Sequence, residues 1–212
     1  MNNVLVTGGS GGIGVEIVRI FTANGYNVYA PTREELNLTS ECVLPHTEFD
    51  IIVNNAGINP IKSIPELTDL DVMTVNYVAP LRIIQQCLPY MMNTQYGRII
   101  NIGSIWGTLA KVNRAAYSAS KAALDSLTRS LTAEYAKYNI LTNTVSPGFI
   151  DTPLTHKNNT EEILNGIRSN IPLGRLGTPE EIAKVVYMLT AQNTYITGQN
   201  IIVDGGFSCT KP

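Results

Sequence analysis

A tyrosine and a lysine stand four positions apart in the stretch AAYSASKAAL (115–124), within a run of small residues. Four residues are slightly more than one helical turn, so Tyr117 and Lys121 share a face of a helix and can reach one ligand. A tyrosine hydroxyl has an ordinary pKa of about 10, and a nearby cation favours its phenolate form. These two residue types are therefore candidates for contact with one substrate or cofactor group. The same spacing also occurs on ordinary amphipathic helices, so the surrounding elements have to decide.

Short apolar runs alternate with longer helical patterns along the chain. The expected strands are 2–7, 26–30, 49–55, 97–104, 139–148 and 200–206, and the helical patterns include 11–25, 69–92, 114–137 and 179–191. Strands that are apolar almost throughout are buried on both faces, as in a parallel sheet covered by helices. We therefore predict an α/β fold, a doubly wound parallel sheet with helices on both faces. No repeat or linker divides the chain, so residues 1–212 are expected to form one domain.

The connection between the second and third expected strands is unusually short. Only residues 31–48 separate YNVYA from FDIIVNN, and they include Pro31 and Pro45. A parallel crossover through another strand needs two connections of roughly 10 to 12 residues each. We therefore predict that one edge strand and its helices have been lost, or reduced to an extended stub near ELNLT (35–39), which leaves about six strands.

A glycine-rich loop, TGGSGGIG (7–14), joins the first expected strand to the first helix. Glycines there permit a tight turn and a close approach of the backbone to a pyrophosphate, and the helix N-terminus attracts the anion. A glycine-rich loop alone can be a flexible turn, but the strand–loop–helix context favours dinucleotide binding. The loop does not end in Gly-Lys-Ser/Thr, which disfavours a nucleoside triphosphate site.

Composition limits the other functions. The 212 residues carry a formal net charge of −2. Because the chain has no excess of basic residues to neutralise phosphates, we expect no nucleic-acid partner. No apolar run approaches the roughly 18 residues of a membrane span, and the start MNNVLVTGG lacks a signal-peptide pattern, so we expect a cytoplasmic protein without a membrane partner. Three cysteines without C-x-x-C spacing and two lone histidines predict neither a disulfide framework nor a metal site.

Four motifs together resemble the short-chain dehydrogenase/reductase family. The glycine loop matches the family's cofactor loop, and NNAG (54–57) matches its second fingerprint, which steadies the sheet and borders the adenine ribose. Asn76, Ser104, Tyr117 and Lys121 match the family's catalytic tetrad in chain order. The segments SPGFIDTPL (146–154) and 172–206 resemble its nicotinamide-side loop and C-terminal segment. Among its members, the chain most resembles the single-domain type that includes 3-oxoacyl carrier-protein reductases, and it departs mainly over residues 31–49.

This resemblance implies a Rossmann fold and an oxidoreductase that transfers hydride reversibly between NAD(P)(H) and a carbonyl or secondary alcohol. Hydride transfer to a ketone leaves an alkoxide that needs a proton. Tyr117 would supply it, Lys121 would favour the phenolate and hold the nicotinamide ribose, Ser104 would polarise the carbonyl, and Asn76 would hold a water that connects Lys121 to solvent. The implied cofactor contacts are Thr7, Gly8, Ser10, Gly12, Ile13, Gly14, Arg33, Asn37, Leu38, Asn55, Ala56, Gly57, Tyr117, Lys121, Pro147, Gly148, Ile150 and Thr152.

Two other functions remain open on this fold. One is a sugar-nucleotide epimerase or dehydratase, although such enzymes usually add a C-terminal substrate domain. The other is a non-catalytic dinucleotide sensor, although sensors typically lose the tyrosine or the lysine. The substrate is expected to be a small carbonyl or alcohol compound covered by a lid at 151–170. Trp106 and Phe149 either form a wall of its pocket or belong to the core.

The cofactor preference depends on the residues that follow the second expected strand. An acidic residue there selects NAD, whereas an arginine accommodates the 2′-phosphate of NADP. Arg33 comes before any acid, which favours NADP(H), but a small shift in register would bring Glu34 or Glu35 to the ribose and select NAD(H). The apolar and small surfaces of helices 71–92 and 114–137 further predict a homodimer or homotetramer.

Overall fold

Each expected apolar run forms a strand of one parallel sheet. The computed structural model describes residues 2–68 and 70–210. Its strands are β1 (Asn3–Val6), β2 (Asn27–Tyr29), β3 (Ile51–Asn54), β4 (Gly97–Ile102), β5 (Ile140–Pro147) and β6 (Asn200–Val203). They lie in the order β2-β1-β3-β4-β5-β6, and every pairing between them is parallel. The chain winds outward in both directions from β1 and β3, which confirms the predicted doubly wound fold.

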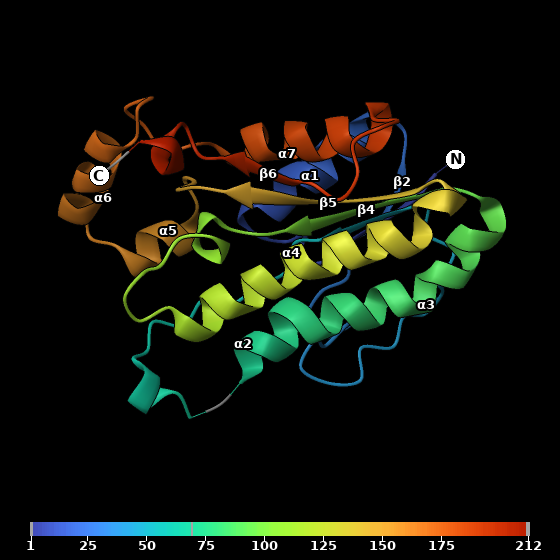
Figure 1. The fold of residues 1–212 in the computed structure, drawn as a ribbon, viewed down its shortest axis with the longest axis horizontal. Coiled ribbons are helices and arrows are strands. Elements are labelled where there is room, and N and C mark those ends of the chain that lie inside the picture. Colours follow the sequence, from blue (N-terminus) through green and yellow to red (C-terminus); the bar gives the residue numbers. More distant parts are fainter. Residues whose placement is uncertain (1, 69, 211–212) are drawn as a thin grey trace.

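Helices cover both faces of this sheet. They are α1 (Gly12–Ala23), α2 (Asp71–Met73), α3 (Ala79–Thr94), α4 (Ala115–Tyr135), α5 (Pro153–Asn158), α6 (Glu161–Asn170) and α7 (Pro179–Tyr187). Helices α3 and α4 lie side by side on one face, and α1 and α7 cover the other (Figure 1). Successive residues of β1 alternate between the two layers, because Leu5 packs with α3 and α4 whereas Val4 and Val6 pack with α1 and α7.

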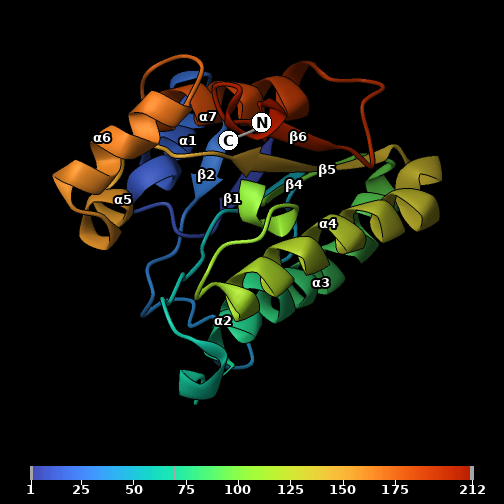
Figure 2. The same ribbon diagram turned by 60° about the vertical axis from the view of Figure 1, so that its left-hand side comes forward.

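The carboxyl ends of the strands point towards α5 and α6, which stand at one end of the sheet (Figure 2). In open α/β sheets, ligands bind at this end, where the strand order reverses. The pattern expected as one helix over 69–92 is divided, because a π-helical turn at Thr74–Val78 separates α2 from α3. Residue 69 lies outside the described part of the chain. Among the described helices, none has the length and apolarity that a bilayer crossing requires.

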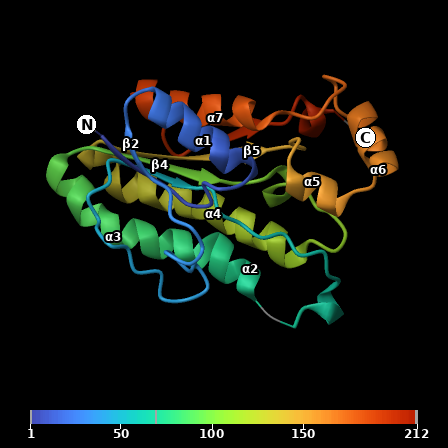
Figure 3. The ribbon, with the colours of Figure 1, turned by 180° about the vertical axis from the view of Figure 1, so that it is seen from behind.

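The shortened connection after β2 contains neither a helix nor a strand. The described residues 30–50 form turns and irregular backbone, so the stub strand expected near residues 35–39 is wrong, whereas the loss of an edge strand is confirmed. The segment instead runs alongside α3 (Figure 3). Gln86 of α3 fixes it, since its side chain accepts a hydrogen bond from Leu44 N at 3.0 Å and donates one to the Cys42 carbonyl at 2.9 Å. Hydrogen bonds from a side chain therefore replace the backbone hydrogen bonds that a further edge strand would make.

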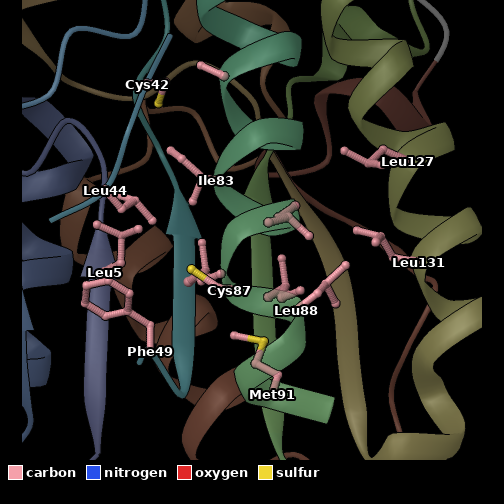
Figure 4. Packing of buried hydrophobic residues seen from close by; sticks show 14 of the residues in the cluster. Leu5, Cys42, Leu44, Phe49, Ile83, Cys87, Leu88, Met91, Leu127 and Leu131 are labelled. Atoms are coloured by element: carbon pink, nitrogen blue, oxygen red, sulfur yellow. The ribbon is translucent and has the colours of Figure 1, made fainter. Parts of the chain in front are cut away.

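The same segment helps to cover the apolar layer beneath it. Leu36, Cys42, Leu44 and Phe49 are buried in the cluster that includes Leu5 of β1. Figure 4 shows Leu5, Cys42, Leu44 and Phe49 on one side of α3, near Ile83 and Cys87, and Leu127 and Leu131 of α4 on its other side. A loop with few backbone partners is thus held mainly by burial, which stabilises by about 25 cal/mol per Å² of apolar surface.

A buried polar chain fixes α4 against the middle of the sheet. Asn54 of β3 donates to the Asn101 side chain of β4 at 2.9 Å, and Asn101 donates to Thr128 of α4 at the same distance. The Thr128 hydroxyl lies 2.8 Å from that of Thr144 on β5. Breaking this network is unfavourable, since each buried polar group left without a partner lowers the free energy of unfolding by about 1–3 kcal/mol. The network fixes where α4 lies along the sheet, and it thereby fixes the positions of Tyr117 and Lys121.

Candidate active site

One cleft of about 790 Å³ opens at the carboxyl ends of the strands and gathers almost all the predicted site residues. Of the predicted residues, those that line it are Thr7, Gly8, Ser10, Gly12, Ile13, Arg33, Asn37, Leu38, Asn55, Ala56, Gly57, Ser104, Tyr117, Lys121, Pro147, Gly148, Ile150 and Thr152. Gly14 and Asn76 are the two predicted residues outside this lining. Segments from the whole length of the chain therefore meet in one place.

The glycine loop has the shape that a pyrophosphate needs. Gly8 adopts a φ of +65°, and a side chain there would lie 2.9 Å from the Ala56 backbone. Gly14 faces the Gly8 carbonyl so closely that a Cβ atom would meet its oxygen at 2.0 Å, so its role is to let α1 approach the loop. The first turn of α1 holds no acidic residue and has no side-chain cap. Free N–H groups at an uncapped helix start therefore fit a dinucleotide phosphate.

Thr7 and Asn55 tie the ends of β1 and β3 together beneath this loop. The Thr7 hydroxyl accepts hydrogen bonds from the backbone N–H groups of Asn55 and Ala56, both at 3.1 Å. The Asn55 side chain donates to the carbonyls of Thr7 and Gly8, both at 3.0 Å. The NNAG motif thus does what its resemblance implied for the sheet. It holds the loop rigidly at the point where the strand order reverses.

Ser104, Tyr117 and Lys121 lie together in the cleft, and the glycines on either side of Ser104 permit this close packing. Gly103, after β4, is so close to Ser146 that a Cβ atom would lie 2.5 Å from its hydroxyl, and Gly107 packs against the backbone of α4 at Lys121. Gly103 thus lets the chain beside Ser104 lie against β5, and Gly107 lets the turn after Ser104 lie against α4. Lys121 is 5% exposed; its Nζ donates to the Ile102 carbonyl at 2.7 Å and lies 5.8 Å from the centre of the Tyr117 ring.

The surroundings shift the acidities of both groups. Burial raises the pKa of Tyr117, while a hydrogen bond with Ser104 and the charge of Arg114 act in the opposite direction. Burial lowers the pKa of Lys121 from its usual 10.5 to about 8. Arg114, which the sequence analysis did not select, is therefore a cation that favours the Tyr117 phenolate. Its position three residues before Tyr117, at the start of a helix, was the available signal.

Asn76 lies in the π-helical turn between α2 and α3, and its side chain is fully engaged within the protein. Its Oδ1 atom accepts from Ile58 N at 2.9 Å, and its Nδ2 atom donates to the Ile58 carbonyl and the Ser120 hydroxyl, both at 3.0 Å. Gly57 fills the gap between Asn76 and Lys121, since a Cβ atom there would lie 3.3 Å from Asn76 Oδ1 and 3.5 Å from Lys121 Nζ. The side chain thus links the NNAG loop to α4.

At the end of the cleft that follows β2, where the adenosine is expected, Arg33 lines the wall, whereas Glu34 and Glu35 do not. A reciprocal pair of hydrogen bonds holds Glu35, whose carboxylate accepts from Thr32 N at 2.8 Å while Thr32 Oγ1 accepts from Glu35 N at 3.3 Å. Arg33 makes no ion pair with any acid in the described part of the chain. The guanidinium is therefore available to a ligand.

Aromatic rings line the part of the cleft beside the Ser104 turn. The Trp106 and Phe149 ring centres lie 5.9 Å apart, and the Phe207 ring centre lies 5.2 Å from that of Phe149. Trp106 and Phe149 line the cleft, and Phe149 also packs against the small buried cluster that contains Leu164. Lys111, a second residue that the sequence analysis missed, also lines the cleft and places its Nζ 4.9 Å from the centre of the Trp106 ring.

The expected lid is two helices with different roles. Thr152 begins α5 by accepting a hydrogen bond from Thr155 N at 3.3 Å, and α5 borders the cleft. Helix α6 contributes no residue to that border among those the structure describes, and Leu164 instead packs in a small cluster with Ile171 and Leu176. Within residues 2–68 and 70–210, no three His, Cys, Asp or Glu side chains are grouped as metal ligands.

Known proteins are similar to this chain in sequence and in fold. The profile of the family described as "Enoyl-(Acyl carrier protein) reductase" matches residues 36–208. The chain is 38% identical to the 3-oxoacyl-[acyl-carrier-protein] reductase FabG of Aquifex aeolicus, over 97% of this chain and 87% of that protein. It is 36% identical to FabG of Vibrio cholerae, over 95% of each. The latter alignment spans 233 positions, more than this chain has residues, which agrees with a shortened segment here.

Solved structures agree with these relatives. A 4-hydroxyisoleucine dehydrogenase complexed with NADH superposes with a TM-score of 0.92 and 29% identity over 100% of both chains. A protein described as a short chain dehydrogenase/reductase family protein gives a TM-score of 0.89 and 28% identity, over 98% of this chain and 97% of its own. Neither the relatives nor the structures favour an epimerase or a sensor. The chain thus belongs to the short-chain dehydrogenase/reductase family, and it is an oxidoreductase that transfers hydride between a nicotinamide dinucleotide and a carbonyl or alcohol group.

Proposed function

We propose that the protein is a carbonyl reductase, reversible as a secondary-alcohol dehydrogenase, in which Tyr117 is the acid/base. The observation that carries this proposal is the convergence of Ser104, Tyr117 and Lys121 in the same cleft as an uncapped glycine loop. A bound nicotinamide supplies or accepts the hydride. The remaining chemistry is proton transfer and polarisation, and these side chains can perform both.

Each side chain has a role that its surroundings support. The Ser104 hydroxyl donates a hydrogen bond to the substrate oxygen and polarises the carbonyl. Tyr117 gives its proton to the developing alkoxide and takes one back in the reverse direction. The Lys121 ammonium binds the ribose hydroxyls and favours the phenolate, an effect to which Arg114 adds. Asn76 is a positioning residue, because its side chain has both amide hydrogens engaged and does not border the cleft.

NADP(H) is the proposed cofactor, with NAD(H) as the alternative. Arg33 lines the adenosine end, while Glu35 is held by Thr32. A guanidinium makes charge-assisted hydrogen bonds to a phosphate. The structural relative named above was solved with NADH, so dinucleotides without the 2′-phosphate fit this fold as well. The preference therefore depends on Arg33, which stands on a loop rather than on a strand.

A panel of ketones, acyl thioesters and sugar derivatives, followed through nicotinamide absorbance with NADPH and with NADH, tests the proposed activity. Turnover of at least one class, lost in Tyr117→Phe with cofactor binding retained, is the expected result. Absence of turnover with every class, despite measurable cofactor binding, would favour a dinucleotide sensor.

Assembly and location extend this proposal. Small residues lie exposed at helical spacing along the outer face of α4, at Ala115, Ala119, Ala122, Ser126 and Ser130. Such a face permits close packing against a second copy, and closed symmetric assemblies predominate among oligomers. We propose a homodimer or homotetramer acting on a small molecule in the cytoplasm. A sedimentation mass near 23 kDa at micromolar concentration would contradict the assembly.

A further inference from the structure

Arg114 is a buried arginine whose hydrogen-bonding capacity is mostly unused. It is 7% exposed, and its Nε atom is buried without a partner. The one hydrogen bond that its guanidinium makes within the described chain is a long one, 3.4 Å from Nη1 to the carbonyl of Asn113. A buried guanidinium without partners costs free energy, so such a group is usually paired. Arg114 therefore needs an acceptor that the chain itself does not provide.

Lys111 adds a second cation on the same side of the cleft. Its Nζ lies 4.9 Å from the centre of the Trp106 ring and 5.2 Å from that of Phe149, so aromatic faces support its charge. Burial lowers the pKa of Lys111, and the charge of Arg114 lowers it further. Both line the cleft, as does Tyr117.

No carboxylate of the described chain neutralises this pair. Among the described residues that line the cleft, Asp71 is the one acid, and it lies beyond ion-pair distance of both cations. Burial also lowers the pKa of Arg114, so its charge is held at a cost. Two unpaired cations beside the proposed acid/base mark the position of an anionic group on the substrate.

We propose that Arg114, assisted by Lys111, binds a carboxylate of the substrate, so that the protein acts on an oxo acid and the corresponding hydroxy acid. This inference rests on the proposed carbonyl reduction at Tyr117. A planar guanidinium matches a carboxylate with two parallel hydrogen bonds, which its terminal nitrogens can donate where Arg114 borders the cleft. The Trp106 and Phe149 rings enclose the apolar part of the molecule. A neutral acyl thioester would leave both cations without a partner.

The test compares acids with their own methyl esters. Pyruvate, acetoacetate and levulinate, each beside its ester, vary the distance from carbonyl to carboxylate, and acetoacetyl-N-acetylcysteamine represents a neutral thioester. The unmodified protein is expected to have at least a tenfold higher kcat/KM for one of the acids than for its ester. Arg114→Gln should lower that value for the acid about ten- to a hundredfold, as expected for charged hydrogen bonds. The ester should lose clearly less, because it loses only the contribution of the Arg114 charge to the Tyr117 phenolate.

Two further variants separate charge from folding. Arg114→Lys keeps the cation and should recover part of the activity on the acid, whereas Lys111→Gln should cause a smaller, acid-specific loss. Arg129→Gln is the matched control, since Arg129 is an exposed arginine of the same helix paired with Asp125 at 2.6 Å. It should change neither substrate. An ester or thioester that is reduced as well as its acid, or an equal loss for acid and ester in Arg114→Gln, would overturn the proposal.

A binding measurement distinguishes this inference from the reaction itself. Calorimetry with levulinate and methyl levulinate, on protein saturated with NADPH and carrying Tyr117→Phe, needs no turnover. Binding of the acid that Arg114→Gln removes supports the carboxylate site even if no oxo acid is reduced. Equal binding of acid and ester, or binding of neither, contradicts the site and leaves the proposed carbonyl reduction to its own test.

Discussion

The two ends of the cleft are built in different ways. At the catalytic end, Ser104, Tyr117 and Lys121 stand where β4 meets α4, and a buried hydrogen-bonded chain from Asn54 to Thr144 fixes that helix. At the adenosine end, Arg33 stands on a connection that contains neither a strand nor a helix. Side-chain bonds from α3 and the burial of a few apolar residues hold that connection in place.

This difference separates chemistry from cofactor choice. Rigid elements hold reacting groups within the narrow limits that proton transfer requires. A loop needs only to present one charge, and it tolerates sequence change more readily. We therefore expect substitutions at the catalytic end to have large effects on turnover, and substitutions at the adenosine end to have modest effects on cofactor preference.

The largest effect is expected at Tyr117. Tyr117→Phe removes one hydroxyl and keeps the ring, so packing is retained while the proton donor is lost. Turnover should fall by at least about a thousandfold, within the range for loss of a general acid, and the dissociation constant for the cofactor should change by less than about threefold. Steady-state rates and a fluorescence titration of NADPH measure the two quantities. Activity within tenfold of the unmodified protein would refute the assignment.

Lys121 should affect cofactor binding and the pH dependence of stability together. Its pKa in the folded protein is about 8, against 10.5 as its usual value, so the unfolded chain binds more protons between those pH values. The free energy of unfolding therefore rises with pH across this window, by about 3 kcal/mol at 1.36 kcal/mol per unit, and the penalty is complete below pH 8.

Lys121→Met should remove that rise and weaken NADPH binding, because the ammonium is lost. Urea unfolding of both proteins at pH 7 and pH 10 without cofactor provides the comparison, and their difference cancels the other titrating groups. An identical pH dependence in the two proteins would show that Lys121 is not buried as a charge.

The effect at Arg33 should be smaller and confined to preference. Arg33→Ala should lower the NADPH-to-NADH ratio of kcat/KM by about tenfold, the lower end of the range for a charged hydrogen bond. The value for NADH should stay nearly constant. Glu34→Gln is the matched control in the same loop and should leave the ratio unchanged. A protein that prefers NADH before any substitution would show that Arg33 does not bind the phosphate.

The smallest effect is expected at Glu35, which bonds reciprocally with Thr32 in the connection that follows β2. Thr32 and Glu35 bond reciprocally, as Thr178 and Glu181 do at the start of α7, but Glu181 also pairs with Arg175 through both carboxylate oxygens. Glu35→Ala should therefore cost less than about 1 kcal/mol of stability, and Glu181→Ala should cost more, within the range for helix caps. Thermal unfolding ranks the two variants, and the reverse order would contradict this account of the loop.

Sequence patterns predicted the catalytic end far better than the adenosine end. The strands, the glycine loop and the relation of Tyr117 to Lys121 follow local periodicity and spacing, which the fold preserves. The sequence of residues 31–48 shows neither helical nor strand periodicity. Contacts with side chains of α3 fix the path of this connection instead. The π-helical turn at Asn76 likewise depends on bonds to Ile58 and Ser120, which lie far away in sequence. A pattern within the chain could not have shown either.

Arg114 and Lys111 were missed for a related reason. They stand in the irregular stretch before α4, where charged residues are ordinarily solvated, and their burial appears only when the Ser104 turn and the aromatic wall close around them. Charged residues make up 15% of this chain, so two cations within four positions of one another beside Tyr117 were a usable signal. The prediction of Asn76 as a water ligand remains untested, and its side-chain bonds favour a positioning role.

The central claim is that one cleft performs chemistry at one end and selects the cofactor at the other. Turnover and the dissociation constants for NADPH and NADH, measured side by side for Tyr117→Phe and Arg33→Ala, test it most directly. We predict that Tyr117→Phe loses turnover while both dissociation constants stay within about threefold, and that Arg33→Ala keeps its turnover number while binding of NADPH alone weakens. A Tyr117→Phe protein that loses cofactor binding in proportion to activity, or an Arg33→Ala protein that loses turnover with both cofactors, would contradict the claim.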